Sequence, residues 1–196
     1  VVYDTDRERM VIVGGAGTAL LNDVWALTPH GTPYWEPLLP TGVAPAPRRL
    51  HAAVYDPLRQ RILMFGGYDG GLFSDLWELP LTGPLEWRRI QPSGSSPSAR
   101  ADVAMIYDPV ADRVVMFGGY DGTSLPTYRR NDLWQLSLAG TPSWSEITPP
   151  TGPTARSGQR AIYDPVRNRM IIFGGYDGAY LNDVWALSLS GPPEWT

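Results

Sequence analysis

Cysteine is absent from the 196 residues, and the 2 histidines, His30 and His51, stand apart from each other. Without thiols the chain has no disulfides and no thiolate metal sites, and two separated histidines do not match zinc-ligand spacing. Lysine is also absent, so arginine supplies all 16 basic residues against 20 acidic ones. The net charge of -4 carries no long run of one sign, which argues against nucleic acid as a partner. No apolar run is long enough to span a bilayer, so we expect no membrane insertion.

The sequence repeats one pattern four times: an apolar run, a pair of glycines and, further on, an Asp-x-Trp. The glycine pairs and the tryptophans that follow them are Gly14-Gly15 with Trp25, Gly66-Gly67 with Trp77, Gly118-Gly119 with Trp134, and Gly174-Gly175 with Trp185. A second tryptophan follows each of these after ten residues. Aromatic residues at a fixed phase of every repeat indicate packing between repeats, since each can bury a large area. A period of about fifty residues with this pattern is typical of kelch-type propeller blades.

On these motifs the chain resembles the kelch-repeat family over nearly its whole length. The resemblance implies an all-β fold, a β-propeller of four kelch-like blades with four antiparallel strands per blade. We expect a single propeller region over residues 1–196, with approximate repeats 1–47, 48–99, 100–155 and 156–196. The family's propellers commonly have more blades, so the resemblance favours four consecutive blades of a larger ring, and a closed four-bladed ring is the alternative.

Each repeat is expected to begin with a strand that ends in Tyr-Asp, as at Tyr55-Asp56. The following turn leads to a second, continuously apolar strand, which predicts burial on both faces, and Gly-Gly is expected to end it. Antiparallel alternation then places two kinds of loop at the same end of the blade: the loop after Gly-Gly and the linker between blades. We call this end the loop face.

The loop face collects the candidate partner-binding residues. Alternating Arg, Tyr and Asp side chains can hold a peptide carboxylate or a glycan through bidentate hydrogen bonds and stacking. The same residues have a structural alternative, in which the repeated Arg bonds loop carbonyls and Asp-Gly forms a turn. The candidates are Arg48, Arg49, Tyr68, Asp69, Phe73, Arg100, Tyr120, Asp121, Tyr128, Arg129, Arg130, Arg156, Tyr176 and Asp177.

Residues that break the repeat are the stronger candidates, because the scaffold does not require them. The third repeat has a longer loop that ends in Tyr128, Arg129 and Arg130, and the second repeat carries a doubled Arg48-Arg49. A long loop is also tolerated without a function, so both readings of the insertion stay open.

The resemblance implies a non-catalytic interaction module that binds a protein or carbohydrate partner through the loop face. Two alternatives stay open: a sugar-acting kelch enzyme with its site partly outside this chain, and a structural subunit of an extracellular assembly. Self-association through open blade ends is a further expectation. We expect no catalytic residues, no cofactor and no metal, because no nucleophile–base pair or cluster with metal-ligand spacing is visible. The compartment is not determined, with an extracellular or secreted location slightly favoured.

Overall fold

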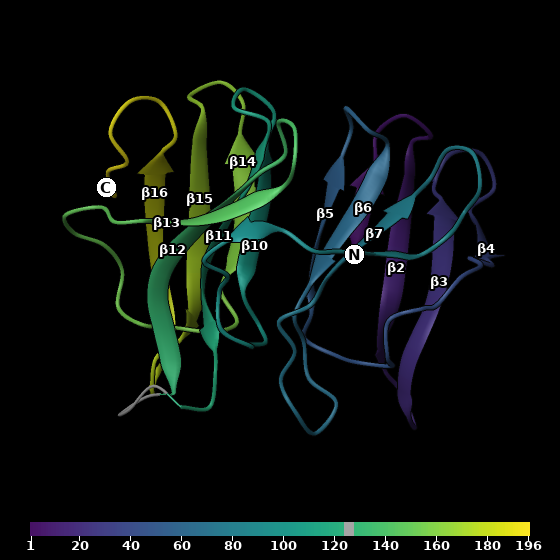
Figure 1. The fold of residues 1–196 in the computed structure, drawn as a ribbon, viewed down its shortest axis with the longest axis horizontal. Coiled ribbons are helices and arrows are strands. Elements are labelled where there is room, and N and C mark those ends of the chain that lie inside the picture. Colours follow the sequence, from purple (N-terminus) through teal and green to yellow (C-terminus); the bar gives the residue numbers. More distant parts are fainter. Residues whose placement is uncertain (124–127) are drawn as a thin grey trace. The chain divides into compact units, whose positions relative to one another are not determined.

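The computed structural model describes residues 1–123 and 128–196, and the regular secondary structure of this part of the chain is entirely β-strand. The chain divides into two compact units, Val1–Ile90 and Gln91–Thr196. Each unit contains two sheets, and Figure 1 labels most of their strands. None of the described residues forms a helix long and apolar enough to cross a membrane.

The first unit holds two four-stranded antiparallel sheets, which we call blades 1 and 2. Their strands follow the chain order, as expected for blades built from successive hairpins. Blade 1 consists of β1 (Val2–Asp4), β2 (Arg9–Ala16), β3 (Leu20–Thr28) and β4 (Tyr34–Leu38). Blade 2 consists of β5 (Ala52–Asp56), β6 (Arg61–Phe65), β7 (Leu76–Pro80) and β8 (Arg88–Ile90).

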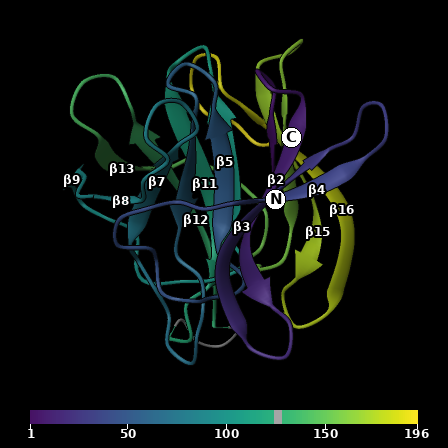
Figure 2. The same cartoon turned by 90° about the vertical axis from the view of Figure 1, so that its right-hand side faces the viewer.

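The second unit holds blades 3 and 4, which depart from the expected four strands in opposite ways. Blade 3 gains β9 (Ser93–Gly94), a piece of the linker that pairs in parallel with β13. Blade 4 has three strands, and an isolated bridge between Leu187 and Trp195 stands where a fourth strand would pair. Figure 2 shows β15 and β16 as adjacent arrows. The remaining bounds are β10 (Ala104–Asp108), β11 (Arg113–Tyr120), β12 (Arg129–Ser137), β13 (Ser143–Ile147), β14 (Arg160–Asp164), β15 (Arg169–Tyr176) and β16 (Tyr180–Ser188).

The all-β fold of four kelch-like blades is thus confirmed, and the first strand of every blade ends at the predicted Tyr-Asp. The expectation that Gly-Gly ends the second strand is right only for β6, which stops at Phe65. In β2, β11 and β15 the strand continues through the glycines, and the pairing register shifts there. A glycine in a bulge absorbs such a shift because it tolerates positive φ.

The core of the first unit lies between blades 1 and 2. Val11 and Val13 of β2, with Val24 and Ala26 of β3, all lie on one face of blade 1, since alternate strand residues share a face. This face packs with residues of blade 2 that include Trp77. The two tryptophans of blade 1 depart from the expected burial, because Trp25 is 38% and Trp35 50% exposed.

Blades 3 and 4 form the core of the second unit in the same way. Ile106, Val115 and Phe117 of blade 3 cluster with Met170 and Ile172 of blade 4. Phe117 also meets the ring of Trp195 edge-on, with the ring centroids 5.1 Å apart. The predicted packing role therefore describes Trp195 well.

Two sheet faces with apolar side chains are exposed. Blade 4 exposes Ile162, Phe173 and Val184, at 62%, 55% and 62%. On blade 1, Met10 and Trp25 are exposed at 37% and 38%. The prediction of burial on both strand faces therefore holds for β6 and β11, whose apolar runs are buried throughout, and not for β2 and β15.

Side-chain hydrogen bonds link neighbouring blades inside each unit. The imidazole of His51 bonds the backbone of Val13, and the amide of Gln159 donates to the Phe117 carbonyl at 2.8 Å. His51 and Gln159 occupy the same position of their repeats, three residues after the linker arginine. Burial is the main cause that lowers the pKa of His51 from 6.5 to about 4.

We expect this histidine to make the chain sensitive to acid. The unfolded chain takes up the His51 proton near pH 6.5, whereas the folded chain resists it down to about pH 4. Stability is therefore lost as the pH falls between these values, by about 2 to 3 kcal/mol in total. His51→Gln, which installs the residue found at Gln159, keeps a donor for Val13 and does not titrate. The difference in unfolding free energy between wild type and His51→Gln, measured by urea at several pH values, should grow from pH 7 to pH 4. A constant difference contradicts the assignment.

Candidate functional site

The loop face of each blade is built by pairing the linker with the loop that follows Gly-Gly. Isolated β-bridges join Arg49 to Tyr68 and Ser157 to Tyr176. A bridge of the same kind joins Ala101 to Tyr120. The structure therefore brings the predicted arginine and tyrosine segments together blade by blade, as antiparallel alternation requires.

The linker arginines are buried at the loop face. Each forms a bidentate ion pair with the Asp of the Asp-x-Trp motif and donates to the carbonyl of the first glycine at 3.0 Å. The same Asp accepts the indole N–H of its tryptophan at 2.7–2.8 Å. The three sets are Arg48–Asp75–Trp77, Arg100–Asp132–Trp134 and Arg156–Asp183–Trp185.

The hydrogen bonds of these arginines lower the pKa of two aspartates. The Arg156 guanidinium and the indole N–H hold the pKa of Asp183 below its ordinary value. At Asp75 burial acts in the opposite direction, and the hydrogen bonds from Arg48 and Trp77 outweigh it. Arg48 and Arg156 are only 2% and 1% exposed, so their guanidinium groups hold the loops and do not face a partner. Arg100 is buried in the same way, so the structural alternative describes all three arginines best.

The aspartates of the Tyr-Asp-Gly loops also serve their own turns. Asp69 accepts the backbone N–H of Gly71 at 3.1 Å, and Asp177 accepts that of Ala179 at 3.2 Å. Asp121 accepts the N–H of Thr123 at 3.0 Å and is 4% exposed. Short-range bonds of this kind stabilise a turn, and they favour the structural alternative for these carboxylates.

Arginine–aromatic contacts remain on the loop face of blade 2. The Arg48 guanidinium lies 3.6 Å from the ring centroid of Phe73, and the Arg49 guanidinium lies 5.6 Å from that of Tyr68. Arg49 itself is exposed. Among the predicted residues of the first unit, Arg49 and Asp69 are exposed and Tyr68 is half-buried.

In the third repeat, residues 124–127 of the predicted loop lie outside the described residues. Arg129, at the start of β12, lies 4.5 Å from the ring centroid of Tyr176 and 6.0 Å from that of Tyr120, and its Nε donates to Ser157 at 3.3 Å. Its neighbour Arg130 forms an ion pair with Asp121. Tyr128 is 43% exposed.

A pocket of about 500 Å³ opens beside Arg129 within the second unit. Its apolar walls come from Phe173, Tyr176, Tyr180 and Leu181. Tyr176 and Tyr180 meet edge-on at 5.2 Å, and Tyr180 is 91% exposed. Its polar lining is Asp102, Arg129, Ser157 and Arg160, with backbone from Gly158, Gly174 and Gly175.

Of this lining, Arg129 and Tyr176 were among the predicted site residues, and the charged residues Asp102 and Arg160 were missed. The repeat contains the information needed to find them. Asp102 stands at a position where the other linkers have Leu50 and Gly158. The φ of Asp102 is 59°, and a positive φ at this position accounts for the glycine at Gly158. Arg160 stands four residues after a linker arginine, where the two preceding repeats have alanine. Arg129 breaks the repeat too, so three charged exceptions line one pocket.

The Asp102 carboxylate is the electrostatically unusual group of the pocket. Burial raises its pKa, and the charges of Arg160 and Arg129 oppose this effect without cancelling it. Its nearest ion-pair contact, to Nη1 of Arg160, is 4.0 Å long.

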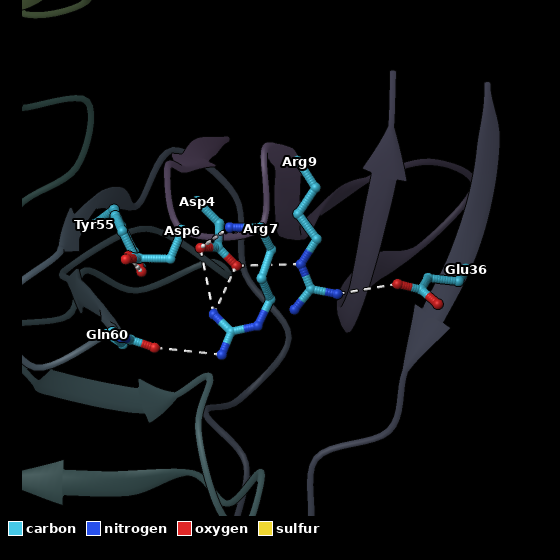
Figure 3. Close-up of polar contacts among 7 residues, drawn as sticks. All are labelled: Asp4, Asp6, Arg7, Arg9, Glu36, Tyr55 and Gln60. Atoms are coloured by element: carbon cyan, nitrogen blue, oxygen red, sulfur yellow. Dashed lines mark hydrogen bonds and ion pairs between the residues drawn. The ribbon is translucent and has the colours of Figure 1, made fainter. Parts of the chain in front are cut away.

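The opposite end of each blade carries a second repeated ion pair, which Figure 3 shows for blade 1. Asp4 is fully buried and accepts from Nε of Arg9 at 3.2 Å, and Arg9 also pairs with Glu36 at 3.0 Å. The Tyr55 hydroxyl donates a hydrogen bond to Asp6, and burial together with this hydrogen bond raises the pKa of Tyr55. The Asp–Arg pair recurs five residues apart in every blade, which indicates a scaffold role.

Among the described residues no group of three or more His, Asp or Glu side chains is arranged to hold a metal ion.

The repeat geometry agrees with a comparison against protein families. A model described as the KLHDC2/KLHL20/DRC7 Kelch-repeats domain matches residues 2–196. The chain belongs to the kelch-repeat family. Kelch repeats of related proteins typically act as protein-interaction modules.

Several curated kelch relatives are much longer than this chain. Host cell factor homolog hcf-1 of Caenorhabditis elegans is 28% identical, covering 97% of the chain and 26% of that protein. The leucine-zipper-like transcriptional regulator 1 homolog of Drosophila melanogaster is 30% identical, covering 90% and 18%. Acyl-CoA-binding domain-containing protein 5 of Arabidopsis thaliana is 32% identical, covering 93% and 28%. The chain therefore spans less than a third of each of these relatives.

Proposed function

We propose that this kelch chain binds a protein partner through the loop face of its second unit, at the pocket beside Arg129. The observation that supports this most is the convergence of Arg129, Asp102 and Arg160, three charged departures from the repeat, on one pocket with aromatic walls. A scaffold alone requires none of them, because other repeats have uncharged residues at the same positions. Apolar walls with a few polar groups are the usual composition of a binding site.

Arg129→Leu tests the proposal, because Leu20 and Leu72 hold the same position in other repeats. Peptides selected by display against the wild-type chain should bind this variant at least about tenfold more weakly, since the variant loses a charged hydrogen-bond donor. Arg167→Met, an exposed change in the turn that follows the Tyr-Asp of blade 4, is the matched control and should bind as wild type. If no peptide is enriched, or if Arg129→Leu binds equally well, the proposal fails.

A glycan is the second candidate partner, which the 91% exposed ring of Tyr180 favours because sugars stack on exposed aromatic faces. Binding to a glycan array that Tyr180→Ala abolishes would support it. A chain that binds no glycan on the array excludes it.

We also propose self-association through the exposed sheet faces. Ile162 and Phe173 of blade 4 are exposed, whereas Ile106 and Phe117, which hold the equivalent positions of blade 3, are buried. Light scattering tests this. We expect a dimer or larger species that Phe173→Asp converts to monomer, and a monomeric wild-type chain contradicts it.

A further inference from the structure

The ion pair between Asp102 and Arg160 is weak, so another carboxylate can displace Asp102 from Arg160. Its two closest atoms are 4.0 Å apart, which is beyond hydrogen-bond distance. The Arg160 side chain is 81% exposed, whereas that of Asp102 is only 25% exposed. An exposed guanidinium held by so long a contact gains little from it, so another carboxylate that reaches hydrogen-bond distance can compete.

The charged groups around this ion pair favour the binding of an anionic ligand. Arg129 reaches the pocket from β12 and Arg160 from β14, against the single carboxylate of Asp102. The other polar side chains of the lining are the hydroxyls of Ser157, Tyr176 and Tyr180. Two guanidinium groups and one carboxylate give the pocket a net positive charge while Asp102 is ionised.

We propose that Arg160 is the carboxylate-binding group of the pocket. In the free chain Asp102 pairs with the Arg160 guanidinium, and an acidic side chain of the partner displaces Asp102 on binding. This inference rests on the proposed function, and it adds the chemistry of the partner. The partner segment carries Asp or Glu beside an apolar residue, because Phe173 and Leu181 wall the pocket next to Arg160.

The displacement predicts an unusual dependence on pH. When Asp102 takes up a proton, it no longer competes for Arg160, so an acidic segment binds more tightly. Burial raises the pKa of Asp102, so lowering the pH protonates it before an exposed aspartate of the partner. A residue with a purely structural role would not produce this dependence on pH, so this readout identifies Asp102 as a positioning residue.

Two variants test the proposal without disturbing the fold. Asp102→Asn removes the competing charge, and Asn adopts the positive φ of this position readily. Arg160→Ala installs the residue that the preceding repeats have, as at Ala52 and Ala104. The probes are two fluorescent hexapeptide pools, one with leucine between two fixed glutamates and one with both glutamates replaced by glutamine.

We expect Arg160→Ala to bind the glutamate pool about tenfold more weakly than wild type, and Asp102→Asn to bind it several-fold more tightly. Wild-type affinity for this pool, relative to that of Asp102→Asn, should rise as the pH is lowered from 7. Binding of the glutamine pool should change in neither variant.

The outcomes separate this inference from the proposed function. If wild type binds the glutamate pool at the pocket but both variants bind it equally well, the proposed function stands and the role of the pair is wrong. Weaker binding by Asp102→Asn likewise overturns the displacement. If wild type binds neither pool and display selection enriches no peptide, the proposed function fails as well.

Discussion

Arg100→Met should lower the free energy of unfolding by about 3 to 5 kcal/mol, because it leaves the largely buried carboxylate of Asp132 without its partner. Arg100 is 1% exposed and donates to Asp132 at 2.6 and 2.8 Å. It also donates to the carbonyls of Ser98 at 3.1 Å and Gly118 at 3.0 Å. A methionine fills part of the space but supplies none of these donors.

Urea denaturation of wild type and variant measures this loss. Arg167→Met is the control, since Arg167 pairs with Asp164 at 3.5 Å through a side chain that is 65% exposed. Such surface pairs contribute about 0 to 1 kcal/mol. A double variant, Arg100→Met with Asp132→Leu, should recover part of the lost stability, because the unpaired charge is gone. A loss below about 1 kcal/mol in Arg100→Met contradicts the assigned role of the linker arginines.

Gly119→Ala should destabilise the chain by about 3 to 5 kcal/mol through backbone strain and overpacking together. Gly119 has a φ of 104°, and a Cβ there would lie 2.4 Å from Cγ1 of Val103 and 2.9 Å from the carbonyl of Ala101. Both atoms belong to the linker that pairs with this loop, so the substitution pushes apart the two segments that form the loop face.

The equivalent glycine of blade 1 provides a matched comparison. Gly15 has a φ of 119°, and a Cβ there would meet nothing within 4 Å. Gly15→Ala should therefore cost only the conformational strain, about 1 to 2 kcal/mol. Denaturation of the two variants side by side separates strain from steric exclusion. Equal losses would show that close approach of the linker is not what requires glycine at Gly119.

Repeated residues are the part of this structure that the sequence predicts well. Gly-Gly, Tyr-Asp and the paired tryptophans recur in phase, so they predict blades, their first strands and the end of the blade at which loops gather. The linker arginines were correctly placed at the loop face. Their burial was not predicted, since it depends on whether an aspartate some 27 to 32 residues later reaches the guanidinium.

The candidate site was predicted only in part, for a related reason. Arg129 and Tyr176 were named, because one breaks the repeat and the other lies in a recurring loop. Asp102 and Arg160 sit in a linker and at the first position of a strand, where no loop insertion draws attention to them. Comparing every residue of a repeat with its counterparts would have singled them out. Their distance from Arg129, however, follows from the packing of blade 4 on blade 3.

The most direct test of the central claim is hydrogen–deuterium exchange of the whole chain with and without the glutamate pool. Binding at the pocket predicts protection of the segments around Asp102, residues 156–160 and residues 174–181, with no change in the turns that carry Asp4 and Asp164. Protection confined to those turns, or to the parts of blade 4 around Ile162 and Val184, would contradict a binding site at the pocket beside Arg129.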